Sequence, residues 1–473
     1  MIVVKLGGTS LAGTDRMRAT ARIVAAHHRT QPVVCVVSAM AGVTDQLLRV
    51  VALATRGEMT YRDTLTTLCT QHEDVLAALT TTTLTTTATT VPTKPVAAGF
   101  ATLWSALEAD LTRLLASATA TDAARQHAVA AFSGWGERLA VALFAAALAE
   151  AEMPTRAFAG EPVVLVERET QVTGEEGDAD NPPWERLAPS VAATRAWIAP
   201  QIVPALGAGK VAVLPGYLAR LRNGLVTTVG RNGSDYSAAL VAAALAAERA
   251  YIYSDVAGIH RADPRIVADA ELLHDLTYAD AAEIALAGAR VLHPGTLRPL
   301  AAARIPLSLR SFLRPDAPGT DIHPATLRTG AQPGRCAWVV TARPLSPERP
   351  LFGPESDWAS GLVEVQGLYL RHADMTATED DHLAPTPVSE VDAPGGHEPG
   401  DGPISGALAL LNTAPRPVGL ALSPRRISVA VPAAEATATQ RRLYSALLHA
   451  DSRMPRETAD GDDTMPGEWR RTS

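Results

Sequence analysis

Short apolar strands that each run directly into small and hydroxyl residues, and then into a helix, constrain the fold of this chain most strongly. Ile2–Val4 form the first such strand and lead into Lys5–Ser10, while Val33–Val37 form the second and lead into Ser38–Thr44. From Ile2 to about Ala78, strand-like and helix-like segments alternate, as expected for βα units of a parallel sheet. Because ligands bind at the carboxyl ends of strands in open α/β sheets, these two loops are predicted to form a binding site.

The first loop has the residue types of a phosphate site. Lys5 precedes Gly7 and Gly8, so backbone amides can surround phosphate oxygens while the ammonium neutralises their charge. The loop is not a Walker A motif, because the lysine comes before the glycines and the G-x-x-x-x-G-K-S/T spacing is missing. The alternative is a structural lysine at the mouth of a strand.

A second candidate anion site lies in Gly230–Ser237, which reads G-R-N-G-S-D-Y-S and precedes an apolar helix. Arg231 can form forked hydrogen bonds to a carboxylate or phosphate. Ser234 and Asp235 can cap the helix, which we expect to start near Tyr236, and its unpaired amides favour an anion. A capped helix after a β-hairpin is the simpler interpretation of the same residues.

Six motifs, in the same order, resemble the motif series of the aspartate kinases. They are Lys5–Ser10 (K-L-G-G-T-S), Val37–Thr44 (V-S-A-M-A-G-V-T), Gly136–Leu139 (G-E-R-L), Thr227–Ala239 (T-T-V-G-R-N-G-S-D-Y-S-A-A), Ser254–Arg265 (S-D-V-A-G-I-H-R-A-D-P-R) and Gly288–Pro294 (G-A-R-V-L-H-P). The resemblance covers roughly residues 1–325. It implies the amino-acid kinase (carbamate kinase-like) fold, an α/β architecture in which a mostly parallel sheet is sandwiched between helices.

The resemblance also implies roles for the acceptor side of the site. Lys5 would stabilise charge on the transferred phosphoryl group. Asp235 would orient Lys5, with helix capping as a secondary role; assisting the metal–nucleotide complex, or capping alone, is the alternative. Arg231 would hold the carboxylate of the acceptor and Glu137 its α-ammonium; a surface salt bridge and a helix-surface glutamate are the respective alternatives. The remaining residues predicted to line the acceptor pocket are Ser38, Ala39, Thr44 and Ser234.

Nucleotide contacts are implied for a second set of residues. These are Gly7, Gly8, Ser10, Ser254, Asp255, Asp263, Arg265 and Arg290. Ser254 stands where the family usually has threonine, Arg290 where it has lysine, and Asn232 where it has glycine. An arginine changes reach and geometry beside phosphate, and Asn232 adds bulk while tolerating left-handed backbone. His293 is expected to be a packed loop residue rather than a metal ligand.

Composition excludes several classes of protein. The chain has 473 residues, 47% of them hydrophobic, which suffices for a large core and a second module. The net charge is −8 with no basic stripe, so no nucleic-acid partner is expected. The three cysteines, Cys35, Cys69 and Cys336, are widely spaced, which favours a reducing compartment. A chain that opens on a strand, without an apolar run of about 18 residues, is expected to be cytoplasmic and not membrane-bound.

The chain is expected to contain a catalytic domain over residues 1–325 and a degenerate ACT-like regulatory region over 326–473. The stretch at about 376–406 is rich in Pro, Gly, Asp and Glu and is predicted to be a disordered insert, and the polar tail 451–473 is expected to fray. The threonine-rich run Leu79–Pro95 is predicted to be irregular. Strands are expected at Cys336–Thr341, Leu362–Leu370, Ala407–Leu411 and Ile427–Val431, and a helix at Ala433–Ala450.

The resemblance to the aspartate kinases implies ATP-dependent phosphorylation of the β-carboxylate of L-aspartate, the first step toward lysine, threonine and methionine. It also implies a homo-oligomer, and Mg²⁺ that bridges the nucleotide phosphates. A carboxylate is already a nucleophile at neutral pH, so such catalysis needs positioning and charge neutralisation rather than a general base. Two alternatives remain: a kinase of the same fold with another acceptor, and a pseudokinase that acts as a ligand-binding regulatory subunit. The sequence identifies no feedback effector.

Overall fold

The computed structural model describes residues 1–81, 93–116, 122–160, 162–169, 187–230, 232–287, 291–324, 338–344, 362–369, 386–388, 419–423, 426–432 and 436–453. The chain divides into two compact units. The first unit comprises Met1–His260 with Glu271–Arg328, and the second comprises Arg261–Ala270 with Thr329–Ser473.

An eight-stranded sheet forms the centre of the first unit, in the order β10-β12-β11-β9-β1-β2-β6-β3. Every neighbouring pair is parallel except β11 and β12. The bounds are β1 Ile2–Leu6, β2 Val33–Val37, β3 Thr155–Ala157, β6 Val211–Pro215, β9 Arg249–Ser254, β10 Asp275–Thr277, β11 Leu307–Ser311 and β12 Thr320–His323. The prediction of a mostly parallel sheet that begins with Ile2–Val4 is therefore confirmed.

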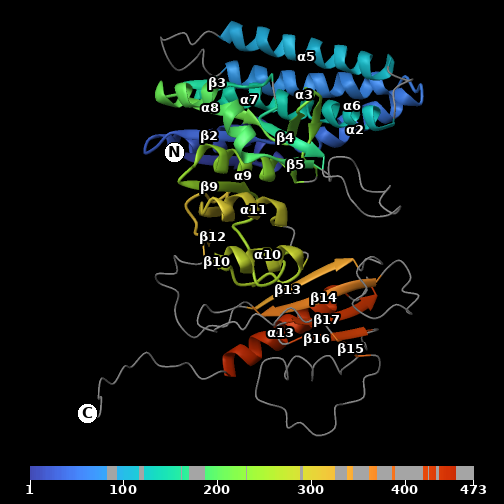
Figure 1. The fold of residues 1–473 in the computed structure, drawn as a ribbon, viewed down its shortest axis with the longest axis vertical. Coiled ribbons are helices and arrows are strands. Elements are labelled where there is room, and N and C mark those ends of the chain that lie inside the picture. Colours follow the sequence, from blue (N-terminus) through green and yellow to red (C-terminus); the bar gives the residue numbers. More distant parts are fainter. Residues whose placement is uncertain are drawn as a thin grey trace, which may run out of the picture. The chain divides into compact units, whose positions relative to one another are not determined.

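Strand β1 lies between β2 and β9, and its side chains alternate between two helical layers. Ile2, Val4 and Leu6 belong to the core that α1 (Thr14–His28) and α7 (Trp135–Glu150) cover. Helices α2 (Val43–Thr55), α3 (Tyr61–Thr81), α5 (Thr93–Ala116) and α6 (Asp122–Ser133) extend this layer, with α5 outermost (Figure 1). Helices α8 (Val191–Gly207), α9 (Gly233–Leu245) and α11 (Pro294–Ala302) form the other layer, and α10 (Tyr278–Leu286) packs on α11.

Within the part of the chain that the structure describes, one helical stretch, His127–Glu150, is long and apolar enough to cross a membrane. Its apolar window is 67% buried inside the protein. Leu139, Val141, Leu143 and Phe144 of α7 are fully buried against α1, α3 and α5. A helix that is apolar on all sides and buried in this way is a core helix.

A second, four-stranded sheet leads the chain into the start of α9. Its order is β5 (Leu187–Pro189), β4 (Val164–Glu169), β7 (Leu218–Leu221) and β8 (Val226–Thr228). The turn residues Arg222, Asn223 and Gly224 predict a hairpin over Gly216–Thr228. Strands β7 and β8 form it, closed by the bond from Gly224 N to Leu221 O (2.9 Å). The hairpin prediction is confirmed.

Helix α9 starts at Gly233, three residues earlier than expected. Its N-cap is Asn232, in the left-handed conformation (φ 55°, ψ 25°) and with no side-chain capping bond. Ser234 and Asp235 lie inside the first turn, so the prediction that they cap the helix is wrong. Asparagine tolerates left-handed backbone better than most residues, which explains why the helix can begin there.

The predicted irregular run Leu79–Pro95 is helical at both ends, because α3 continues to Thr81 and α5 begins at Thr93. Residues 82–92 lie outside the described residues. His293, predicted to be a packed loop residue, is exposed, and its Nδ1 accepts a hydrogen bond from Gly295 N (3.1 Å) as the N-cap of α11. His293 acts as the N-cap because it stands immediately before Pro294, the first residue of the helix, where proline is favoured.

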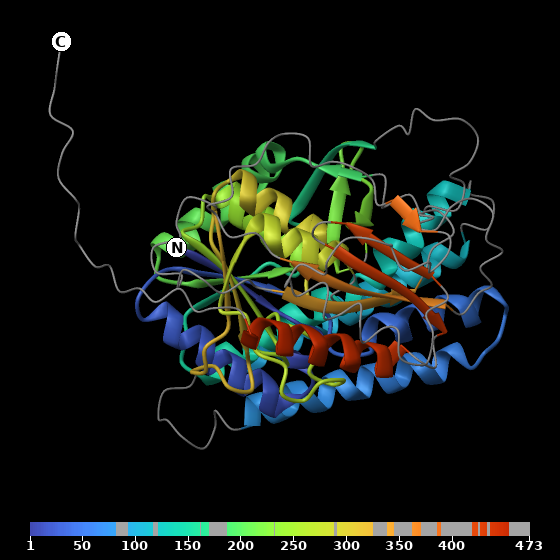
Figure 2. The ribbon, with the colours of Figure 1, turned by 90° about the horizontal axis from the view of Figure 1, so that it is seen from below.

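The second unit contains a fully antiparallel five-stranded sheet. Its order is β13 (Trp338–Pro344), β14 (Leu362–Tyr369), β17 (Arg426–Pro432), β16 (Gly419–Ser423) and β15 (Thr386–Val388). Helix α13 (Ala436–Arg453) packs along one face of it, against β13, β14 and β17 (Figure 2). Three of these strands and the helix correspond to predicted elements. The loop 261–270 joins this unit through the bonds Val340 N to Arg261 O (2.7 Å) and Arg441 Nε to Ile266 O (2.8 Å).

The segment at about 376–406 was predicted to be a disordered insert, but Thr386–Val388 within it form strand β15, which pairs with β16. The rest of that segment, the predicted strand Ala407–Leu411 and the tail after Arg453 lie outside the described residues. Helix α13 includes Asp451–Arg453, the first residues of the expected tail. The ACT-like assignment stays a prediction.

Candidate active site

A cleft of about 500 Å³ opens at the carboxyl ends of β1, β2 and β6 in the first unit. The structure brings together most of the predicted acceptor-side residues here, although they come from segments far apart in the sequence. The predicted residues that line the cleft are Lys5, Gly8, Ser38, Ala39, Thr44, Glu137, Ser234 and Asp235.

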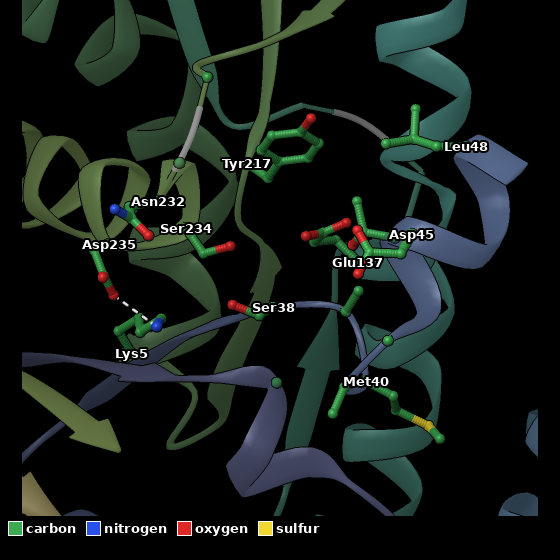
Figure 3. Close-up of a pocket in the computed structure, with 17 residues that line it drawn as sticks. Lys5, Ser38, Met40, Asp45, Leu48, Glu137, Tyr217, Asn232, Ser234 and Asp235 are labelled. Carbon is green, nitrogen blue, oxygen red and sulfur yellow. Dashed lines mark ion pairs between the residues drawn. The ribbon is translucent and has the colours of Figure 1, made fainter. Parts of the chain in front are cut away.

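Lys5 forms an ion pair with Asp235 on one side of the cleft (Figure 3). Lys5 Nζ lies 2.6 Å from Asp235 Oδ1, and the two side chains are only 11% and 13% exposed. Lys5 faces α9 because alternate residues of β1 point to opposite faces of the sheet. Asp235 lies in the first turn of α9, where the helix dipole stabilises a carboxylate. This pair holds the lysine ammonium in place at the end of β1.

Close backbone contact presses the loops after β1 and β2 together. A Cβ on Gly8 would lie 2.8 Å from Ala39 O, so only glycine fits there. Ala41 N donates to Gly8 O (3.2 Å), and Ser38 N donates to Leu6 O (3.0 Å). The two loops therefore form one continuous wall of the cleft.

Gly7 and Ser10, both predicted to contact nucleotide, do not line the cleft. The buried Ser10 hydroxyl donates to Gly7 O (2.6 Å) and so stabilises the turn after β1. A Cβ on Gly7 would lie 3.3 Å from Lys5 Nζ and 3.6 Å from Tyr253 O, which places Gly7 beside both the lysine and the end of β9.

Glu137 lies across the cleft from the Lys5–Asp235 pair, with the hydroxyls of Ser38 and Ser234 between them (Figure 3). It lies in the first turn of α7, and Gly136 lets that turn approach the loop after β2, since a Cβ there would lie 2.6 Å from Ala39 Cβ. The predicted alternative of a helix-surface glutamate is wrong, because only 4% of Glu137 is exposed.

Burial determines the acidity of Glu137. Loss of solvation raises its pKa to about 7, against the opposing effects of backbone hydrogen bonds at Ala39 and Glu137 itself and of the Lys5 charge. Its Oε2 atom is buried without a hydrogen-bond partner among the described residues. A buried carboxylate oxygen without a partner is costly, and a cationic ligand group would satisfy it.

Ser254 and Asp255, also predicted to contact nucleotide, are not among the residues that line the cleft. Ser254 ends β9, and its Oγ accepts a bond from Val256 N (3.3 Å); Asp255 follows it. Asp263 and Arg265 are paired with each other through Arg265 Nη2 and Asp263 Oδ2 (2.8 Å) and belong to the second unit. Arg231 and Arg290 lie outside the described residues.

Three residues that line the cleft lie outside the motifs that predicted it: Asp45, Leu48 and Tyr217. Leu48 lies one helical turn after Thr44, so the periodicity of α2 could have identified it. Tyr217 follows β6, and the rule that ligands bind after parallel strands could have identified it as well.

The sequence model of the amino acid kinase family matches residues 1–311. This chain belongs to the amino acid kinase family. The cleft thus lies in the family region of the chain, and the resemblance to the aspartate kinases is confirmed by its curated relatives.

Two relatives indicate the extent of that similarity. The lysine-sensitive aspartokinase 3 of Escherichia coli (strain K12) is 44% identical over 135 residues, which are 28% of this chain and 30% of the relative. The aspartokinase of Chlamydia trachomatis serovar D is 28% identical over 322 residues, which are 67% of this chain and 63% of the relative. The chain therefore spans less than two thirds of the length of these relatives.

Solved structures agree at the level of the fold. E. coli aspartokinase III in complex with aspartate and ADP superposes with a TM-score of 0.66 at 21% identity, covering 95% of this chain and all of that one. The aspartate kinase of Clostridium acetobutylicum superposes with a TM-score of 0.60 at 16% identity, covering 94% of this chain. The predicted amino-acid kinase fold is confirmed.

Proposed function

We propose that this protein transfers the γ-phosphoryl group of ATP to the β-carboxylate of L-aspartate, giving 4-phospho-L-aspartate and ADP. The observation that carries the proposal is that one cleft contains two opposite charges on opposite sides, the Lys5 ammonium, which Asp235 holds, and the buried carboxylate of Glu137. An amino acid with two carboxylates and one ammonium matches both sides. Aspartokinase relatives and a neighbour solved with aspartate and ADP support this choice of substrates.

In the reaction, a β-carboxylate oxygen attacks the γ-phosphorus, and the bond from that phosphorus to the β–γ bridging oxygen breaks. The bonding electrons leave with ADP, and no proton has to be removed from the nucleophile. The catalytic task is therefore positioning and charge stabilisation. Lys5 supplies the positive charge, Asp235 holds its ammonium in place, and the backbone at Gly8 brings the two loops close to the phosphoryl group.

Different residues are assigned to the opposite ends of the amino-acid acceptor. Glu137, with its unpartnered Oε2, binds the α-ammonium, and Arg231 binds a carboxylate through its planar guanidinium. Ser38, Ala39, Thr44 and Ser234 complete the acceptor pocket.

Nucleotide is assigned to the end of β1 and the end of β9, with Gly7, Gly8, Ser10, Ser254 and Asp255 as its contacts in the first unit. Arg290, Asp263 and Arg265 stay predicted contacts from the motifs in which they stand. Among the described residues, no three His, Cys, Asp or Glu side chains cluster as a metal cage. Magnesium is usually held by one or two carboxylates plus substrate phosphates, so Mg²⁺ arriving with ATP fits this donor set. When bound, the ion neutralises phosphate charge.

The wider assignments belong to the same proposal. The protein is a cytoplasmic enzyme of lysine, threonine and methionine synthesis, acts as a homo-oligomer, and has neither nucleic-acid nor membrane partners. Its catalytic domain ends near residue 325 and an ACT-like region follows. The mixed surface charge, with a net value of −8, supports a small-molecule enzyme.

The test is a coupled assay of ADP release with Mg·ATP and a panel of acceptors: L-aspartate, L-glutamate, carbamate and a nucleoside monophosphate. ADP release with aspartate, together with trapping of the acyl phosphate by hydroxylamine, is expected. Release with another acceptor alone would assign the protein to a different branch of the family. Aspartate binding by calorimetry without ADP release would instead favour the regulatory subunit.

A further inference from the structure

Tyr217 has an unusual backbone conformation at the edge of the cleft. Its φ is 63°, in the left-handed region that non-glycine residues avoid because Cβ crowds the carbonyl oxygen. It lies between β6 and β7 and lines the cleft that holds Lys5 and Glu137 (Figure 3). Strained residues persist only where their surroundings fix them, and they concentrate at functional sites.

One set of contacts fixes Tyr217 to the turn before α9. Tyr217 O accepts a hydrogen bond from Val229 N (2.8 Å). Its ring covers Gly233 so closely that a Cβ on that glycine would lie 2.8 Å from Tyr217 Cδ2. The preceding Gly216 meets the next residue of the same helix, since a Cβ on Gly216 would lie 2.7 Å from Ser234 Cβ. Tyr217 therefore packs against the wall of the cleft that carries Ser234 and Asp235.

A second set of contacts fixes the same segment to the junction of α6 and α7. The buried Ser133 hydroxyl has one proton, and two acceptors lie within hydrogen-bond distance of its oxygen: Ala130 O (2.7 Å) and the hydroxyl oxygen of Tyr217 (3.3 Å). Leu218, the next residue, covers Gly134, where a Cβ would lie 2.2 Å from Leu218 Cδ2. Ser133 and Gly134 precede Glu137 by one turn of helix, so this junction sets where the first turn of α7 begins.

We propose that Tyr217 is a positioning residue. Its hydroxyl, through Ser133, fixes the first turn of α7 relative to the turn before α9, and this geometry sets the affinity for the amino-acid acceptor. The two walls it joins carry the groups assigned to opposite ends of that acceptor, so the inference rests on the proposed function. Without the contact between the two hydroxyls, the distance between Glu137 and α9 is no longer fixed. Acceptor binding is then weaker, while nucleotide binding is unchanged.

The test compares Tyr217→Phe, Ser133→Ala and the double variant with wild type. A hydrogen bond is worth about 0.5–1.5 kcal/mol, so each single variant should raise KM for aspartate about two- to tenfold, with KM for ATP within about twofold. The double variant should show no larger effect than Ser133→Ala, because Tyr217→Phe removes only an interaction that Ser133→Ala has already removed. Tyr251→Phe, on β9 away from the cleft, is the matched control and should behave as wild type.

Tyr217→Gly separates positioning from a merely structural role. Glycine relieves the left-handed strain but removes the ring and hydroxyl. Aspartate KM should rise more than in Tyr217→Phe while KM for ATP stays near its wild-type value. A parallel rise of both constants would indicate a structural role and overturn the inference.

Two outcomes separate this inference from the proposed function. Wild-type enzyme with no aspartate-dependent ADP release would overturn the proposed function, and this inference with it. Active wild type, with folded Tyr217→Phe and Ser133→Ala variants at wild-type KM for aspartate, would overturn this inference alone.

Discussion

Lowering the pH from 8 to 6 is expected to raise KM for aspartate because of the burial of Glu137. Burial raises the pKa of Glu137 to about 7. Only the ionised carboxylate attracts an ammonium, and with this pKa about nine tenths of Glu137 is ionised at pH 8 and about one tenth at pH 6. The binding-competent fraction therefore falls about tenfold, and the apparent KM should rise by the same factor.

The assay measures aspartate KM at saturating Mg·ATP across this range, and the control is Glu137→Gln. The amide has no titrating group, so its KM should be high and nearly independent of pH. Aspartate KM that stays constant in wild type between pH 6 and 8, or that rises equally in Glu137→Gln, would refute the assignment of Glu137 to the ammonium.

The same burial affects stability with a definite sign. Glu137 has a raised pKa in the folded state, so its contribution to stability is full below its unfolded pKa of about 4.3 and is lost as the pH rises through about 7. At pH 8 the folded protein contains a buried carboxylate whose Oε2 has no hydrogen-bond partner among the described residues. Glu137→Gln should therefore unfold at a temperature no lower than wild type at pH 8, while binding aspartate less well.

Three further outcomes are expected. Lys5→Ala should lower turnover by about 10²-fold, as for loss of one preorganised charge stabiliser, and wild-type turnover in a folded variant would exclude that role. Asp321→Asn should lower the free energy of unfolding in urea by about 1–3 kcal/mol, because Arg310 Nη2 contacts both carboxylate oxygens (2.9 and 3.0 Å). Burial raises the pKa of Asp321, but Ser308, Arg310 and Arg249 together lower it by more, so the folded pKa lies below the unfolded value. This stabilisation is therefore present above the unfolded pKa and is lost as the pH falls through the folded pKa. A variant with wild-type stability at neutral pH would contradict this. Millimolar lysine or threonine, alone or together, should inhibit weakly or not at all at subsaturating aspartate, since the sequence after residue 325 carries no recognisable glycine and acidic signature for an effector amino acid. Sigmoidal inhibition by either would contradict this.

Local patterns predicted much of the fold because its central strands are short and almost wholly apolar. Val33–Val37 and Val211–Leu214 are buried along their whole length, so sequence alone marks them as inner strands of a parallel sheet. Strands β11 and β12 and the three-residue strands β3, β5, β10 and β15 were not predicted. Each of the three-residue strands forms through pairing with a partner distant in sequence rather than through its own residues. Their short runs carry no periodicity to detect.

The candidate site was predictable where a motif contains the chemical group itself. Lys5, Glu137 and Asp235 each stand inside a motif, and the structure brings all three to one cleft. The start of α9 was misplaced because the left-handed Asn232 begins the helix without a side-chain cap, so a rule based on capping residues points too far along the chain. The place of Tyr217 after β6 was readable from sequence, but its contacts with Ser133 and Gly233 were not, because they exist only in the folded protein.

The positions without side chains determine how the charged groups meet. Gly8 allows the loop after β1 to touch Ala39 O, and Gly136 allows α7 to touch the same residue from the other side. Ala39 is therefore the point where the phosphoryl side and the ammonium side of the cleft come together. A Cβ at either glycine would separate the two sides by displacing backbone, which is rigid, rather than a flexible side chain. The distance between Lys5 and Glu137 thus depends on backbone packing at Ala39 as much as on the charged residues themselves.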